Sequence, residues 1–187
     1  MTRIAVIDSG IHAGHPHVGS VAGGVAICGD DFVDRIGHGT AVAAVIREKI
    51  PDAELYAVKI FDRKLSTDID TLVRAIRWCA AHEIEWINLS LGTQNDEHKA
   101  LLREAVQFCP AKIVAAAGWL PGKLPGVVPV ELDWDCPRDE LRSELLSDGR
   151  TLYRASGYPR PIPGVPPERN LKGISFAVAN VTGLLAK

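Results

Sequence analysis

The stretch Ile4-Ala-Val-Ile-Asp-Ser-Gly10 decides the fold. Its apolar run from Ile4 to Ile7 shows no polar alternation, which is typical of a strand buried on both faces of a parallel sheet. The run ends at Asp8, and Gly10 indicates a turn just beyond it. Because open α/β sheets bind ligands outside the carboxyl ends of their strands, this pattern predicts that Asp8 lies at a functional edge.

Further apolar runs follow this strand and alternate with segments of helical periodicity. Within residues 68–82, apolar side chains recur at the spacing of one helix face, at Ile69, Leu72, Val73, Ile76 and Cys79. We expect strands at Arg3–Asp8, Glu54–Ile60, Trp86–Leu91 and Lys112–Ala117, and helices at Thr40–Lys49, Asp68–His82 and Asp96–Phe108. This alternation predicts an α/β fold, a three-layer αβα sandwich around a mainly parallel sheet.

The composition changes after Leu120. Residues 120–167 hold nine of the twelve prolines, which interrupt helices and favour ordered loops. Two short strands are expected in this part, at Val127–Leu132 and Thr151–Ala155, and a last helix at Gly173–Ala186. Because no internal repeat or linker divides the chain, we expect residues 1–187 to form one domain.

The overall composition excludes several functional classes. The net charge is −2 and no run of Lys or Arg forms a polybasic patch, so nucleic acid is not an expected partner. The apolar runs fall well short of the roughly 20 residues that span a bilayer, and the N-terminus lacks the pattern of a secretory signal. A cytoplasmic protein without a membrane partner is predicted. The four cysteines form no C-x-x-C pair, so neither a zinc site nor a redox motif is indicated.

Two more segments place a reactive side chain at the start of a helix. His38 stands between glycines in Gly37-His-Gly-Thr40, which leaves little backbone bulk around the imidazole. Ser175 occupies the first helical turn in Gly173-Ile-Ser-Phe-Ala177, where unpaired N–H groups and the helix dipole suit a developing oxyanion. With Asp8, these segments contribute a carboxylate, an imidazole and a hydroxyl, each at the edge of a regular element.

The three segments resemble those of the subtilisin-like serine proteases, the subtilase family. The family's motifs correspond, in the family's own order along the chain, to Asp8-Ser-Gly10, His38-Gly-Thr40 and Gly173-x-Ser175-x-Ala177. The chain is similar to a minimal, intracellular-type member, and the resemblance is weakest between Leu120 and Gly149.

Two further strands carry the resemblance and imply where a substrate binds. Ile87-Asn-Leu-Ser-Leu-Gly92 looks like the family's substrate-binding strand, and Ile113-Val-Ala-Ala-Ala-Gly118 looks like the strand that leads to its oxyanion residue. The resemblance implies that a peptide or protein substrate lies along Ser90, Leu91, Gly92, Ala116, Ala117 and Gly118 by strand addition. It also implies that Ser175 attacks the carbonyl, His38 moves the proton and Asp8 orients the imidazole, without a cofactor or metal.

The sequence departs from the family pattern next to the predicted oxyanion site. The family has an Asn whose side chain donates to the oxyanion, together with a donor at the serine, but here Trp119 occupies that position. Loss of such a donor lowers kcat by roughly 10²–10³-fold. An indole has one N–H donor, so Trp119 either replaces the amide in part or only fills a pocket. Two smaller departures are Ile174 for the usual Thr and Ala179 for the usual Pro.

Two clusters of polar residues are not assigned to the chemistry. His12, His15 and His17 lie close together in sequence, without an obvious Cys or carboxylate partner, and surface or substrate-lining side chains explain them better than a metal site. Asp30, Asp31 and Asp34 precede His38 and are expected to form a solvated acidic loop, the alternative being a preference for basic substrates. No acidic cage suited to calcium is present.

Three functions remain open at this stage. The leading one is a serine endopeptidase, with limited processing of particular peptides favoured over bulk degradation. The second, motivated by Trp119, is a pseudoprotease that binds peptides or a partner protein with little or no turnover. The third is another acyl transfer, such as ligation or ester hydrolysis, on the same triad. The sequence does not determine the natural substrate or the oligomeric state.

Overall fold

The computed structural model describes residues 1–187 and contains one eight-stranded sheet. Its strands are β1 (Arg3–Asp8), β2 (Gly23–Ala26), β3 (Glu54–Lys59), β4 (Trp86–Leu89), β5 (Lys112–Ala116), β6 (Val127–Leu132), β7 (Arg142–Leu145) and β8 (Thr151–Ala155). The helices are α1 (His38–Lys49), α2 (Ile69–Ala81), α3 (Lys99–Gln107) and α4 (Ile174–Leu185), with short 3₁₀ turns η1 (Asp96–His98) and η2 (Pro167–Arg169).

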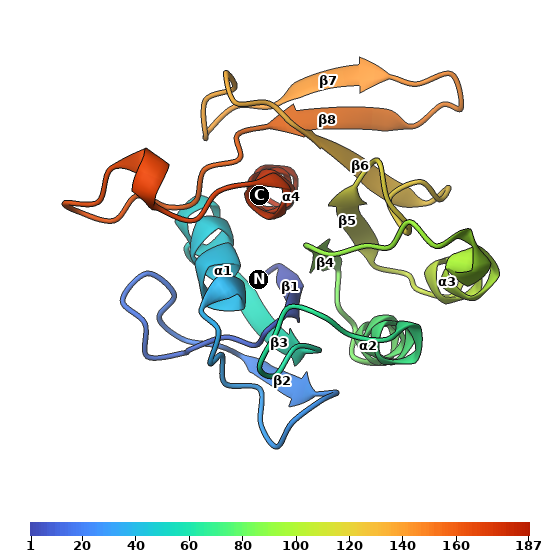
Figure 1. The fold of residues 1–187 in the computed structure, drawn as a ribbon, viewed down its shortest axis with the longest axis horizontal. Helices are drawn as coiled ribbons and strands as arrows, with labels where there is room; N and C mark the ends of the chain where they lie inside the picture. Colours follow the sequence, from blue (N-terminus) through green and yellow to red (C-terminus); the bar gives the residue numbers. More distant parts are fainter.

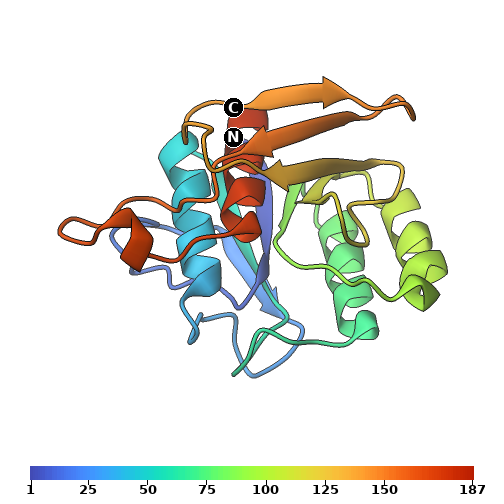
Figure 2. The ribbon, with the colours of Figure 1, turned by 45° about the horizontal axis from the view of Figure 1, so that its top comes forward.

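The sheet has the order β2-β3-β1-β4-β5-β6-β8-β7, and every neighbouring pair is parallel except β7 with β8. Helices α1 and α4 cover one face, and α2 and α3 cover the other, as Figures 1 and 2 show. The predicted α/β sandwich with a mainly parallel sheet is therefore confirmed.

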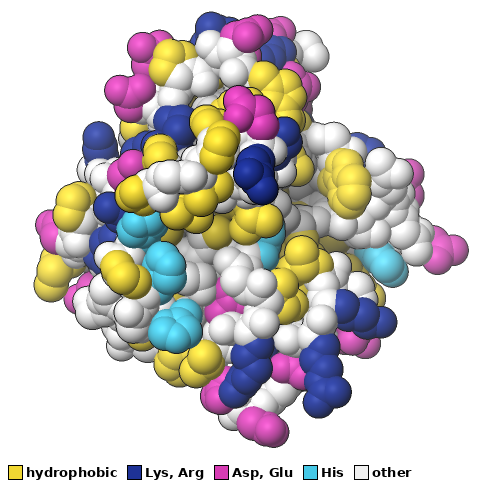
Figure 3. Space-filling view, turned by 60° about the vertical axis from the view of Figure 1, so that its left-hand side comes forward, with side chains coloured by type: hydrophobic (Ala, Val, Ile, Leu, Met, Phe, Trp, Pro, Cys, Tyr) yellow, Lys and Arg dark blue, Asp and Glu magenta, His cyan; other side chains and the backbone are white.

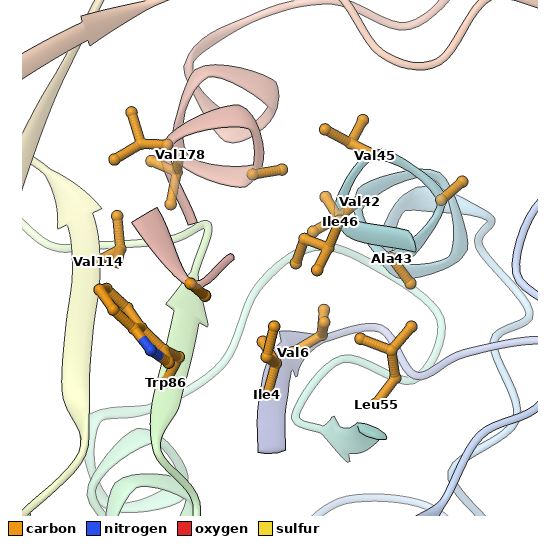
Figure 4. Packing of buried hydrophobic residues seen from close by; sticks show 14 of the residues in the cluster. Ile4, Val6, Val42, Ala43, Val45, Ile46, Leu55, Trp86, Val114 and Val178 are labelled. Atoms are coloured by element: carbon orange, nitrogen blue, oxygen red, sulfur yellow. The ribbon is translucent and has the colours of Figure 1, made fainter. Parts of the chain in front are cut away.

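Two hydrophobic clusters, one on each face, hold the layers together. The larger one joins α1 and α4 to β1 and β3, and Figure 4 shows Val42 and Ile46 of α1 packed over Ile4, Val6 and Leu55 of the strands. Residues 4 to 7 are all fully buried. The continuous apolar run of β1 follows from this, because successive side chains enter the two clusters alternately.

The predicted elements agree with the structure to within a few residues, but two strands were missed. β2 consists of Gly-Gly-Val-Ala, which carries almost no strand propensity and pairs only with β3. β7 is fully exposed and polar, and it pairs as an antiparallel edge with β8. β2 packs only Val25 against the core and β7 packs no side chain there, so neither strand produces the periodicity that identifies strands in a sequence.

This topology places the ends of β1 and β4 beside the starts of α1 and α4. The carboxyl ends of β1 and β4 are neighbours in the sheet, and α4 packs against both β4 and α1. Asp8, His38 and Ser175, which are far apart in sequence, therefore come to the same edge of the sheet. No helix has the length and apolar character needed to cross a membrane.

Candidate active site

Asp8 and His38 form the centre of the site. His38 Nδ1 lies 2.8 Å from Asp8 Oδ1 and 2.9 Å from Oδ2, and the Asp8 side chain is completely buried. Because a carboxylate can only accept, Nδ1 is the nitrogen that carries the proton. The Nε2 lone pair of the neutral ring is therefore free to accept a proton from a substrate or a nucleophile.

Gly39 makes this contact possible, since it lets the first turn of α1 approach the end of β1. A Cβ at this position would lie 2.2 Å from the Gly10 carbonyl oxygen and 3.1 Å from Asp8 Cβ. Any side chain would push α1 away from the strand and separate the imidazole from the carboxylate. On the other side, the ring of His38 packs against Phe176, with 5.7 Å between ring centroids.

A buried network behind the pair involves Ser9 and Asp34. Ser9 Oγ donates to Asp34 Oδ1 (2.9 Å) and accepts from the Gly39 N–H (2.9 Å). Asp34 also accepts from the N–H groups of Ile36, Gly37 and Thr40 and from the Thr40 hydroxyl. Burial raises the pKa of this carboxyl, but the hydrogen bonds outweigh burial and hold the pKa below its usual value.

The expectation of a solvated acidic loop is thus wrong for Asp34, which is only 7% exposed. The aspartates differ because the chain turns back around Asp34, so that successive N–H groups converge on its carboxylate. Asp31, in contrast, pairs on the surface with Arg35 through two hydrogen bonds, and Asp30 is exposed.

Replacement of Asp34 by alanine should destabilise the protein strongly. The change leaves several buried donors without an acceptor, and we expect the free energy of unfolding to fall by about 3–5 kcal/mol. Urea denaturation followed by circular dichroism measures this loss. Asp30→Ala, an exposed neighbour without these bonds, is the matched control and should change stability by less than about 0.5 kcal/mol. Equal stability of the two variants would contradict the structural role of Asp34.

Ser175 lies in the first turn of α4, and its hydroxyl does not bond to His38, the partner that a catalytic triad requires. Ser175 Oγ donates to the Ser90 carbonyl oxygen at 3.3 Å, and no hydrogen bond joins it to His38. The backbone N–H of Ser175 has no acceptor within the chain, as is usual at a helix N-terminus. This N–H is therefore available to an oxyanion formed above the serine.

One cleft of about 380 Å³ contains both His38 and Ser175. Besides these two, its walls are formed by Phe61, Leu65, Ser66, Thr67, Ser90, Leu91, Gly92 and Trp119. We call this space the Ser175 cleft. The backbone N–H and C=O groups of Leu91 and Gly92 have no partner in the chain, which leaves them open to pair with an extended peptide.

The structure separates the two segments that were expected to bind the substrate. Ser90, Leu91 and Gly92 line the Ser175 cleft, but Ala116, Ala117 and Gly118 do not. The Ala117 N–H donates to Val130, and the Ala116 carbonyl accepts from Trp119. With these backbone groups already used inside the chain, the second segment has less to offer a peptide than the first.

Trp119 lines the Ser175 cleft, with its side chain partly in solvent. It is 45% exposed, and its indole N–H donates to no group of the chain. Its backbone is fixed because the next residue, Leu120, forms an antiparallel bridge with Thr93. Gly92 fits against this bridge, since a Cβ there would lie 2.7 Å from the Leu120 carbonyl oxygen and 2.9 Å from Trp119 Cβ.

Comparisons with known proteins agree with this arrangement. The model of the Peptidase_S8 subtilase family matches residues 1–119, which is more than half of the chain. The chain belongs to the subtilase family. The family match ends before Ser175, but an alignment with subtilisin DY of Bacillus licheniformis covers 98% of this subtilase and 75% of that protein, at 30% identity.

Other relatives and solved structures extend the likeness. The minor extracellular protease Epr of Bacillus subtilis (strain 168) is 37% identical over 131 residues, which are 62% of this chain but 20% of Epr. This subtilase spans 51% of subtilisin E from the same organism. The prenylagaramide maturation protease PagA superposes with a TM-score of 0.71 at 25% identity over 99% of this chain and 73% of PagA. A lanthipeptide protease gives 0.73 at 20% identity, over 97% and 71% of the two chains.

Sequence reasoning missed two parts of this subtilase's site. Ser9 was noted only as part of a motif, although its hydroxyl connects the His38 loop to Asp34. The segment from Phe61 to Thr67 was not considered, although it forms one wall of the Ser175 cleft. Its position directly after β3, at the carboxyl edge of the sheet, was the available signal.

Proposed function

We propose that this chain is a serine endopeptidase in which Asp8, His38 and Ser175 act as the catalytic triad. The observation that carries the proposal is the hydrogen bond from His38 to the buried Asp8 carboxylate, beside a cleft that also contains Ser175. The neutral imidazole is oriented with Nε2 free, which is the state that a general base needs. The family's proteases use this chemistry, so the subtilase match supports the same assignment.

In the proposed reaction, Ser175 exchanges partners when a peptide binds. Its hydroxyl leaves the Ser90 carbonyl by rotation about the Cα–Cβ bond and donates to His38 Nε2. Catalytic hydrogen bonds of this type often tighten only in the complex with substrate. Oγ then attacks the scissile carbonyl carbon while Nε2 takes the proton. His38 returns that proton to the leaving amine, and water releases the acyl group by the reverse sequence.

The charges that develop in this reaction have partners in the site. The imidazolium formed at His38 faces the buried Asp8 carboxylate, and the oxyanion lies near the free N–H of Ser175. The acyl side of the peptide pairs with Leu91 and Gly92 as an added strand. The oxyanion contact with the Ser175 N–H and the strand pairing with Leu91 and Gly92 together hold the scissile bond at Ser175.

We further propose that the enzyme processes particular peptides rather than degrading proteins in bulk. The Ser175 cleft is small, and the bridge between Thr93 and Leu120 closes the space behind Gly92. A cleft with these limits accepts few side chains next to the scissile bond. The likeness to PagA, which is a maturation protease, supports this choice.

The direct test of the proposal is covalent labelling with a fluorophosphonate probe, which reacts only with an activated serine. We expect the wild type to be labelled at Ser175 and the Ser175→Ala variant to remain unlabelled. A wild-type protein that does not react would overturn the proposed enzyme.

The reaction should require an unprotonated His38, and its pH dependence follows from that residue. Burial lowers the pKa of His38, but the hydrogen bond and charge of Asp8 and the charge of Asp34 raise it, so that the net direction is upward from 6.5. Activity is lost as the pH falls through this raised pKa. We therefore expect kcat/KM for a peptide substrate to reach half of its maximum above pH 6.5. A midpoint below that pH would contradict the proposed electrostatic role of Asp8.

Replacement of Trp119 by asparagine should increase turnover. The indole N–H makes no hydrogen bond in the chain, whereas an amide at this position can donate to the oxyanion together with the Ser175 N–H. We expect kcat to rise by about 10²-fold, the lower end of what one such donor contributes. Trp119→Phe, which removes the N–H and keeps an aromatic ring, is the control and should leave kcat within about twofold. If Trp119→Phe lowers kcat sharply instead, the indole already serves as the donor.

A further inference from the structure

A second pocket lies beside the Ser175 cleft, and no step of the proposed reaction uses it. Its volume is about 450 Å³. The loop that carries His12, His15 and His17 forms one wall, and the proline-rich loop with Arg160 forms another. We call it the histidine pocket. Figure 3 shows the histidine side chains gathered in a row on this face, beside a hollow in the surface.

Arg160 lines this pocket and carries a positive charge that no carboxylate neutralises. It is half-buried, and one of its five N–H groups donates to the His17 carbonyl oxygen at 3.1 Å. No carboxylate lies within 4 Å of its guanidinium, whereas the half-buried Arg138, Arg150 and Arg154 each have an acidic partner. The half-buried Arg47 also lacks one, but its N–H groups donate to four carbonyl oxygens. Arg160 therefore keeps unused donors in a confined space.

The other lining groups leave the pocket without a free negative charge. Asp34 is the one carboxylate in its lining, and its oxygens already accept five hydrogen bonds from the chain. Arg35 also lines the pocket and is paired with Asp31. A carboxylate entering the histidine pocket would thus meet a guanidinium with open donors and no uncompensated acid.

The histidines add donors and do not form a metal site. The His17 N–H donates to His15 Nδ1 at 3.2 Å, so the neutral His15 ring carries its proton on Nε2 and presents a donor. The His15 and His17 rings meet edge to face, with 5.2 Å between their centroids. No three His, Cys, Asp or Glu side chains of the chain lie close enough together to hold a metal ion. The His15 ring therefore offers a hydrogen bond to an acceptor in the pocket.

We propose that the histidine pocket binds the carboxylate of a glutamate or aspartate in a peptide ligand, with Arg160 and the neighbouring histidines as its partners. This assignment rests on the proposed function when it is used to say on which side of the cleaved bond the acidic residue lies. Gly37, Asn170 and Leu171 line the pocket and lie just before His38 and Ser175 in the chain, whereas Ser90 and Gly92 line the Ser175 cleft and not this pocket. A peptide whose acyl side pairs with Leu91 and Gly92 would carry the acidic residue on its leaving-group side.

The binding test uses the Ser175→Ala protein, so it does not depend on turnover. The probes are the capped tetrapeptides acetyl-Ser-Glu-Glu-Ser-amide and acetyl-Ser-Gln-Gln-Ser-amide, titrated while the imidazole resonances of His12, His15 and His17 are followed by NMR. We expect the glutamate peptide to shift these resonances and to bind about tenfold more tightly than the glutamine peptide, as is typical of a charge-assisted hydrogen bond.

Two arginine variants make the test specific to the pocket. Arg160→Gln can still donate to the His17 carbonyl but loses the charge, and it should weaken binding of the glutamate peptide about tenfold. Arg169→Gln changes an exposed arginine of the same loop that does not line the pocket, and it should leave the affinity within about twofold. Equal affinities for the two peptides, or equal effects of the two variants, would overturn the proposal.

A cleavage assay separates this inference from the proposed function. Wild-type protein is given a mixture of peptides that carry Glu or Gln at each position on the leaving-group side of the cleaved bond, and products are identified by mass spectrometry. About tenfold faster cleavage of the Glu peptides at one position supports both proposals. Selective binding of the glutamate tetrapeptide without any cleavage supports the histidine pocket and counts against the peptidase.

Discussion

Replacement of Ser175 by alanine is expected to lower kcat for peptide hydrolysis by about 10⁶-fold and to abolish fluorophosphonate labelling, because the change removes the only atom that forms the covalent intermediate. The fall in kcat is of the size known for loss of the nucleophile in subtilisin. KM should change little, since the peptide still pairs with Leu91 and Gly92. Stopped peptide-cleavage assays at saturating substrate measure the residual rate.

The control for this experiment must show that the fold persists. Ser175 is half-buried and its hydroxyl makes one long hydrogen bond, to the Ser90 carbonyl, so the methyl group of alanine should fit without strain. Ser143→Ala on the exposed strand β7 is the matched change and should keep full activity. A Ser175→Ala protein that cleaves peptides as fast as the wild type would show that another group is the nucleophile.

Most of the fold could be predicted because its central strands are buried on both faces. β1, β6 and β8 have the expected boundaries, and in β1 the reason is plain, because charged Arg3 and Asp8 bound its apolar run. The end of β4 was placed too late, at Leu91 instead of Leu89, because apolar Leu91 follows closely although the ladder with β5 has stopped at Leu89. Both of these extra residues, Ser90 and Leu91, line the Ser175 cleft.

The site could be predicted only as far as its motifs extend. Glycines around His38 and the strand end at Asp8 indicate positions that a helix and a sheet bring together, and the structure places these two residues in contact. The buried role of Asp34 was not recognised, because it depends on a loop that turns back so that its own N–H groups converge on the carboxylate. No periodicity encodes such a turn, and Asp34 lies in no motif.

Substitution of Asp8 by asparagine should lower kcat by about 10⁴-fold, although the two side chains have the same shape. The Ser9 N–H donates to Asp8 Oδ1 at 2.7 Å, so an asparagine here keeps its amide oxygen toward Ser9. Its NH₂ group then occupies the position of Oδ2, which is 2.9 Å from His38 Nδ1. The amide oxygen also lies 2.8 Å from Nδ1, but an N–H on Nδ1 would face the NH₂ group, so we expect Nδ1 to lose its proton and Nε2 to gain it. The imidazole can then no longer accept the proton of Ser175.

This tautomer argument differs from a loss of stability in two measurable ways. Labelling of Asp8→Asn by the fluorophosphonate should slow to the same degree as hydrolysis while circular dichroism stays unchanged. The midpoint of the pH profile should also move down, because the charge that raises the pKa of His38 has gone. Asp70→Asn, on the exposed start of α2, is the matched control and should alter neither rate nor midpoint. If Asp8→Asn retained the wild-type rate, the Asp8 carboxylate would only hold the imidazole in place. The proton of Ser175 would then reach His38 without the tautomer that the Asp8–His38 bond imposes.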